Sequence, residues 1–211
     1  MHYRLTALCF IALTTLITAC APMTMPEQLA ASDYQGQTAL LVGTYAHTRG
    51  VEKYDVESIW FQNIETEEYY RIHTQNAFDL FTAQTDYTIL DKNSEGFVFA
   101  FKIPAGKYRI RSAVLSEDNM QYRGYDVFNS EFIVESGKPN YLGEVKTHVL
   151  EGENFLGMTV TRGAVFMVSN KLERDLLFIS QKYPEINWKL AKVVTPKSNT
   201  KDQNVHIVGK F

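Results

Sequence analysis

The chain has 211 residues, a formal net charge of −3 and an aromatic content of 13%. This slightly acidic balance excludes a general nucleic-acid-binding protein, which needs a strongly basic surface. Both cysteines, Cys9 and Cys20, lie within the first 20 residues. The rest of the chain therefore has no thiol for a disulfide, a thiolate metal site or a nucleophile.

The first 19 residues have the pattern of a signal peptide. Arg4 precedes an almost uninterrupted apolar run from Leu5 to Ile17, which is shorter than the roughly 20 residues that span a bilayer. The run ends in Ile17-Thr18-Ala19-Cys20, which resembles the lipobox of bacterial lipoproteins. That resemblance implies cleavage before Cys20 and acylation of Cys20 by fatty acids such as palmitate. The alternative is an ordinary secretory signal, cut near Ala19 or Ala21.

The residue after the cysteine indicates a destination. Ala21 stands there in place of Asp, and in enterobacteria this resembles the pattern of lipoproteins sent to the outer membrane. We therefore expect a lipid anchor on the periplasmic face of the outer membrane. Removal of residues 1–19 leaves 192 residues, with 20 Lys and Arg against 24 Asp and Glu, a net charge of −4. A chain of this length forms one domain that buries about 70% of its unfolded surface.

The remainder predicts a tether followed by a β domain. Residues 20–36 are small, polar and proline-containing, which favours a flexible tether after the lipidated Cys20. Across residues 37–194, short aromatic and β-branched runs alternate with turn residues, as is typical of an antiparallel β-sandwich. The predicted strands are 38–46, 56–63, 69–73, 86–90, 97–103, 107–115, 130–135, 140–147, 155–161, 164–169 and 186–190. Residues 195–211 read as a polar tail with a closing strand at 205–211.

Two hairpins and one helix stand out within this pattern. Pro104-Ala105-Gly106 predicts a turn that pairs strand 97–103 with strand 107–115. Ser136-Gly137-Lys138-Pro139 predicts a second hairpin between 131–135 and 141–145. The helix is expected over about 171–183, because apolar residues recur there at helical spacing and a proline follows. Those residues are Leu172, Leu176, Ile179, Tyr183 and Pro184.

The turn residues carry a family resemblance. The segment from Ile103 to Tyr108, followed by Phe132, Ser136-Gly137-Lys138 and Tyr141-Leu142-Gly143, resembles prealbumin-like (carboxypeptidase regulatory-like) β-sandwich domains. Bacterial lipoproteins also use such domains. The resemblance implies a fold and no catalytic set, because the matching residues are structural.

The strongest candidate for a binding site is the segment 116–129, which is expected to be a long loop. Tyr122, Arg123, Tyr125 and Phe128 stand there among Asn, Gln and Asp, a mixture suited to stacking on sugars or to contacts in a protein interface. The alternative is a connection whose aromatic residues fold back onto the sandwich.

No motif predicts catalysis, a metal or a cofactor. His47, His73 and His148 are dispersed, and neither a metal-binding pair nor a nucleophile motif is present. The sequence therefore predicts a non-catalytic envelope adaptor that binds another envelope protein. A carbohydrate- or peptidoglycan-binding module is the alternative. A hydrolase whose acids and histidines converge only in the fold is the third hypothesis.

The lipid anchor is directly testable. The Cys20→Ser variant of the full chain removes the acylated thiol, and with it the acyl chains, each of whose buried methylenes contributes about 0.8 kcal/mol to membrane binding. We expect the variant to leave the outer-membrane fraction for the soluble or inner-membrane fraction on cell fractionation, whereas the Cys9→Ser variant stays in the outer membrane. Recovery of both variants in the outer membrane would contradict lipidation.

Overall fold

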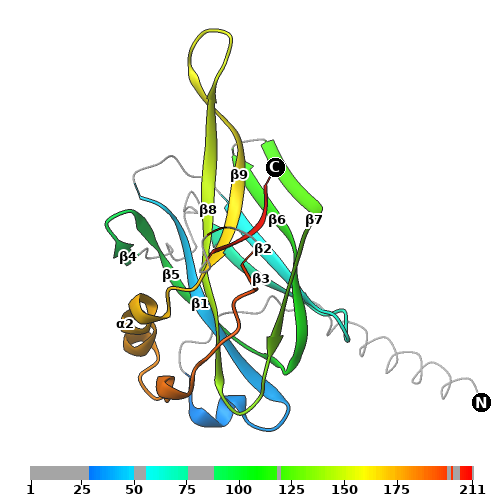
Figure 1. The fold of residues 1–211 in the computed structure, drawn as a ribbon, viewed down its shortest axis with the longest axis vertical. Helices are drawn as coiled ribbons and strands as arrows, with labels where there is room; N and C mark the ends of the chain where they lie inside the picture. Colours follow the sequence, from blue (N-terminus) through cyan, green and yellow to red (C-terminus); the bar gives the residue numbers. More distant parts are fainter. Residues whose placement is uncertain are drawn as a thin grey trace, which may run out of the picture.

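The computed structural model describes residues 29–49, 56–75, 88–117, 120–198, 201 and 205–210 (Figure 1). In chain order the elements are η1 (Ala31–Tyr34), β1 (Thr38–Thr48), β2 (Val56–Asn63), β3 (Tyr69–Gln75), β4 (Thr88–Asp91), β5 (Ser94–Pro104), β6 (Gly106–Glu117), β7 (Met120–Val134), β8 (Pro139–Glu153), β9 (Thr159–Ser169), α2 (Leu172–Lys182), η2 (Trp188–Leu190), β10 (Lys192–Val193) and β11 (Val205–Lys210). The predicted fold class, a mainly β sandwich with one α-helix near the C-terminal end, is confirmed. Among the described residues, no helix is both long and apolar enough to cross a membrane.

Two sheets form the layers of the sandwich. The first sheet has the order β11-β9-β8-β1-β5-β4, with β10 also paired to β8, and the second sheet has the order β3-β2-β6-β7. Most neighbours are antiparallel, but β8 runs parallel to both β1 and β10. The expected closing strand is present as β11, which pairs with β9 at the edge of the first sheet.

The main core lies between the two sheets. Alternate residues of β5 point into it, because successive side chains of a strand face opposite sides of the sheet. Phe97, Phe99 and Phe101 are buried there against the aromatic residues of the second sheet. Phe61 of β2, for example, packs edge-to-face against Phe101 of β5 with the ring centroids 5.6 Å apart. The aromatic content of the sequence is thus concentrated in a cysteine-free core.

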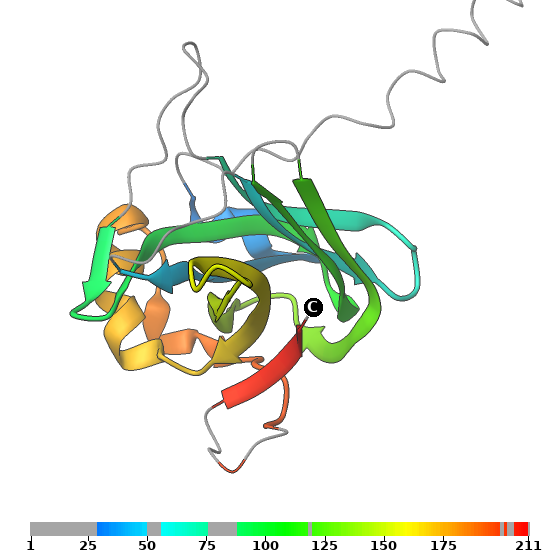
Figure 2. The same cartoon turned by 90° about the horizontal axis from the view of Figure 1, so that it is seen from above.

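A second apolar cluster covers the outer face of the first sheet. Leu40 and Val42 of β1 point to this side, where they meet Ile179 of α2 and Tyr183 directly after it. The helix therefore lies on the opposite side of the first sheet from the second sheet (Figure 2). Because β1 is covered on both faces, its sequence is almost continuously apolar and does not alternate.

A buried charged group fixes α2 to this face. The Asp175 carboxylate is fully buried and accepts hydrogen bonds from Thr44 Oγ1 at 2.7 Å and from Tyr141 Oη at 2.6 Å. Arg174 forms ion pairs with Asp175, with Glu144 at 2.7 Å and with Asp91 at 2.8 Å. Burial alone would lower the pKa of Arg174, but the carboxylates of Asp175 and Glu144 outweigh it and raise that pKa.

Both predicted hairpins are wrong in their pairing, although their strands are present. β5 belongs to the first sheet and β6 to the second, so the turn at Pro104-Ala105-Gly106 crosses between the layers. The same is true of β7 and β8, which the turn at 136–138 connects across the sandwich. The buried Asn140 amide holds this second crossing, because it donates to the carbonyls of Leu40 and Glu135. Alternation of apolar and polar residues fits both a hairpin and a crossing between the sheets, since the same side chains face the core in both.

Four local predictions are also corrected. Residues 120–129, expected in a loop, belong to β7. Residues 188–190, expected in a strand, form the 3-10 helix η2. Residues 155–158, expected at the start of a strand, form a turn before β9. The described part of the predicted tether packs on the domain, because Leu29 and Tyr34 are buried in the outer cluster.

The charged group predicts a stability effect. Replacement of Asp175 by Asn removes the charged acceptor of the Thr44 and Tyr141 hydroxyls and one of the three carboxylates that pair with Arg174. We therefore expect the free energy of unfolding to fall by about 3 kcal/mol. Denaturant unfolding followed by circular dichroism measures this. The matched control is Glu173→Gln, an exposed acid on the same helix turn, which should change the free energy by less than about 0.5 kcal/mol. Equal effects of the two variants would contradict the structural role of Asp175.

Candidate functional site

The β8–β9 hairpin extends beyond the body of the sandwich (Figure 1). The pairing of β8 with β1 ends at Thr147, whereas its pairing with β9 continues to Glu153 opposite Thr159. The last residues of β8 are therefore held by β9, and among the described residues no strand pairs with their other side. Because the same two strands lie in the body of the first sheet, the projection continues their ladder, with one register shift between Leu150 and Glu151.

A structured turn closes this hairpin. We call residues Asn154–Met158 the tip. Asn154 Oδ1 accepts hydrogen bonds from the N–H groups of Leu156 and Met158, at 2.9 and 3.0 Å. Gly157 has a φ of 75°, a left-handed conformation that favours glycine. An Asn at the first position and a left-handed Gly at the fourth are the turn chemistry of a three-residue hairpin loop.

The side chains that this turn displays are apolar. Phe155, Leu156 and Met158 are 95%, 65% and 53% exposed. Central turn residues at the end of a projecting hairpin are usually polar, because nothing covers them. Burial of one large apolar side chain contributes roughly 1.5–3 kcal/mol. The tip therefore displays apolar surface that a binding partner can bury.

Charged residues surround the base of the tip. Glu151 and Glu153, which we call the acidic collar, are exposed on β8. The Arg162 guanidinium on β9 donates to the backbone carbonyl of Glu153 and lies against Gly152. The three side chains sum to a charge of −1 at pH 7. An acidic collar disfavours contact with anionic lipid headgroups.

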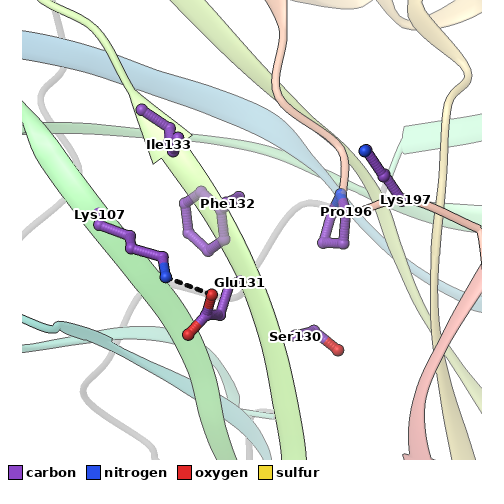
Figure 3. A pocket seen from close by; sticks show the side chains of 7 residues that line it. All are labelled: Lys107, Ser130, Glu131, Phe132, Ile133, Pro196 and Lys197. Carbon is purple, nitrogen blue, oxygen red and sulfur yellow. Dashed lines mark ion pairs between the residues drawn. The ribbon is translucent and has the colours of Figure 1, made fainter.

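A cavity of about 350 Å³ lies elsewhere, beside the last residues of β7 (Figure 3). Its apolar residues are Phe132, Ile133 and Pro196, and Ile133 is 57% exposed. Its polar residues are Lys107, Ser130, Glu131 and Lys197, with Lys107 Nζ and Glu131 Oε2 paired at 2.5 Å. We call this cavity the β7 slot.

The residues that the sequence singled out for binding do not share a loop. Tyr122, Arg123 and Tyr125 lie along β7, opposite Leu115, Val114 and Ser112 of β6. Phe128 follows in the stretch where the β6–β7 register shifts. Their side chains lie outside what the structure describes, so their role in binding stays a prediction. Cys20 and the signal peptide also lie outside the described residues.

His47 and His73 pair with residues of neighbouring strands, whereas the Nε2 atom of His148 on β8 is buried without a hydrogen-bond partner among the described residues. His47 Nε2 lies 3.1 Å from Glu95 Oε1, and the two residues are direct partners in the β1–β5 ladder. His73 Nδ1 likewise lies 2.7 Å from Ser58 Oγ, its partner in the β2–β3 ladder. Such cross-strand pairs are ordinary sheet contacts. In the described part of the chain, no group of three or more His, Cys, Asp or Glu side chains could hold a metal ion.

One buried carboxylate lies at the end of the core from which the hairpin extends. Glu57 accepts a hydrogen bond from the phenol of Tyr45, which also lies 2.6 Å from Thr147 Oγ1. All three residues are buried. This group joins β2 to β1 and β8, and therefore ties the second sheet to the base of the projecting hairpin.

Comparisons with known proteins show no family. No protein-family model and no curated protein sequence matches the chain. Among solved structures, a leucine-rich repeat protein from Bacteroides thetaiotaomicron aligns at 10% identity and a TM-score of 0.32. The alignment covers 53% of this chain and 14% of that protein.

The sequence around the tip fits two local structures. Phe155-Leu156 predicts the beginning of a strand, because apolar residues favour strands. Asn154 and Gly157 are the residues that a hairpin loop demands at these spacings. An Asn-x-x-Gly turn with two large apolar residues at its centre is the pattern that indicates an apolar projection.

The turn geometry is testable on its own. Asn154→Ala removes both side-chain hydrogen bonds within the tip, each of which is worth about 1 kcal/mol. We expect hydrogen exchange at the amides of Leu156 and Met158 to accelerate about fivefold. Thr159→Ala, one residue beyond the tip, is the control and should leave both rates unchanged. Unchanged rates in Asn154→Ala would show that the turn does not depend on this side chain.

Proposed function

We propose that this chain is a non-catalytic lipoprotein of the outer membrane, anchored through Cys20 on the periplasmic face, that acts as an envelope adaptor. The tip of the β8–β9 hairpin is the part that binds a protein partner. The observation that carries this proposal is the exposure of Phe155, Leu156 and Met158 on a pre-formed turn.

The energetics suit a protein interface. Full burial of the three side chains contributes on the order of 5 kcal/mol, in the range of the few residues that dominate many interfaces. The turn is already ordered, so little conformational entropy is lost when the tip is bound. A lipid anchor adds to this by confining the chain to one membrane, which raises its local concentration.

The chemistry of the tip favours a protein over a glycan. Sugar recognition combines an aromatic face with several hydrogen-bonding side chains, whereas Phe155, Leu156 and Met158 offer no polar side-chain atoms for hydroxyl groups. An apolar cavity on a partner protein can accept all three side chains. Peptidoglycan binding through Tyr122, Arg123, Tyr125 and Phe128 stays the alternative.

Site-specific photo-crosslinking in living cells tests the proposal. A photoreactive amino acid replaces Leu156 in the full-length, lipidated chain, and adducts are separated on gels and identified by mass spectrometry. We expect one discrete protein adduct at this position. The matched control is Leu177 on α2, which is also 65% exposed but belongs to a different surface, and no discrete adduct is expected there.

The outcomes discriminate between the hypotheses. A protein adduct that forms at Leu156 and disappears when Phe155 is also replaced by Ser supports the adaptor. Adducts with peptidoglycan alone, or equal adducts at Leu156 and Leu177, would overturn it.

A further inference from the structure

We propose that the tip of one copy docks into the β7 slot of a second copy of this chain. This inference rests on the proposed function, because it names the partner of the same tip. It is drawn from three properties of the tip and the slot: their size and polarity, their charges, and their positions at opposite ends of the molecule.

The tip and the slot match in size and polarity. The slot has a volume of about 350 Å³, at the small end of the range for ligand pockets, roughly 300–1,000 Å³. A cavity of this size suits one or two large side chains, such as Phe155 with Leu156. Phe132, Ile133 and Pro196 give the slot apolar walls. Ile133 is more than half exposed in the single chain, so docking would remove apolar surface from water on both sides of the contact.

The charges are opposite in sign. Lys107 and Lys197 against Glu131 give the slot a net charge of +1 at pH 7. Glu151 and Glu153 against Arg162 give the base of the tip a net charge of −1. The tip, with its acidic collar, therefore meets an apolar slot whose three charged side chains, Lys107, Glu131 and Lys197, sum to one positive charge. Complementary rims of this kind fix the register of a contact and disfavour wrong partners.

The positions of the tip and the slot exclude docking of the tip into the slot of the same chain. The slot residues of β7 lie just before the turn that leads into β8, whereas the tip follows the end of β8 (Figure 1). β8 has 15 residues, which at about 3.4 Å per residue separate its two ends by roughly 50 Å. The tip must therefore reach the slot of another copy. Each copy carries both a tip and a slot, so the contact is head-to-tail and extends into a row of molecules.

Such a row is compatible with the lipid anchor. The first described residue, Leu29, is nine residues beyond Cys20, a span of at most about 30 Å. Copies that lie with their long axes along the membrane can all remain anchored. The last copy in the row keeps its tip free for another envelope protein.

Engineered disulfides test this contact in the full chain. Cys9 and Cys20 are the chain's own cysteines, and neither belongs to the described domain. Leu156→Cys and Ile133→Cys are placed in two differently tagged copies, which are co-expressed and analysed on non-reducing gels. We expect a disulfide-linked heterodimer, and a ladder of multimers when one chain carries both substitutions. Leu177→Cys with Ile133→Cys is the matched control, and no heterodimer is expected from it.

A charge exchange tests the register. Glu151→Lys with Glu153→Lys places like charges opposite the slot, and we expect the yield of heterodimer to fall about fivefold. Lys107→Glu with Lys197→Glu in the second copy should restore that yield. Absence of a heterodimer, an equal yield from the Leu177 control, or a yield unchanged by both charge reversals would overturn self-docking.

Failure of this inference is distinguishable from failure of the adaptor proposal. A photo-crosslinked adduct at Leu156 with a different protein, in the absence of a disulfide between positions 156 and 133, would remove the second copy as partner and leave the adaptor proposal standing. Absence of both products would remove both.

Discussion

The long strand β8 is the constraint on which the rest of the structure depends. Residues 139–147 of β8 pair with β1, and residues 144–153 pair with β9. Among the described residues, β9 is the strand that pairs with the outer part of β8 beyond Thr147. The inner half supplies Tyr141 and Glu144, which hold the buried charges of α2. The outer half carries the acidic collar and the tip. The exposed tip is therefore connected by one strand to buried residues of the first sheet.

This connection explains how an apolar tip can remain exposed. An apolar loop on a flexible segment would fold back onto the nearest apolar surface. Here the tip is kept away from the domain by backbone hydrogen bonds between two strands, and its turn is ordered by Asn154 and Gly157. The exposed apolar side chains are thus presented in a fixed geometry, which is the arrangement expected of a binding element.

The sequence predicted local structure better than long-range pairing. β2 was predicted with its observed bounds, and the helix within one residue at each end, because spacing of two or 3.6 residues is a local property. The pairing of β5 with β6 and of β7 with β8 was wrong, because alternation does not distinguish a hairpin from a crossing between sheets. The polar aromatic residues of 120–129 predict a loop, but the segment is part of β7, an edge strand of the second sheet. The exposed tip was not predicted. Its turn residues are local signals, but its exposure depends on a long-range property, namely that β1 ends before β8 does.

Loss of a protein complex on removal of the apolar tip tests the central claim most directly. The full chain and its Phe155→Ser/Leu156→Ser variant are treated with an amine-reactive crosslinker in intact cells, purified and compared by mass, and the thermal unfolding midpoint of each is measured. The account predicts a discrete crosslinked complex for the unaltered chain. For the variant it predicts the uncomplexed chain with an unchanged midpoint. A variant that retains the complex would contradict the role of the tip in binding.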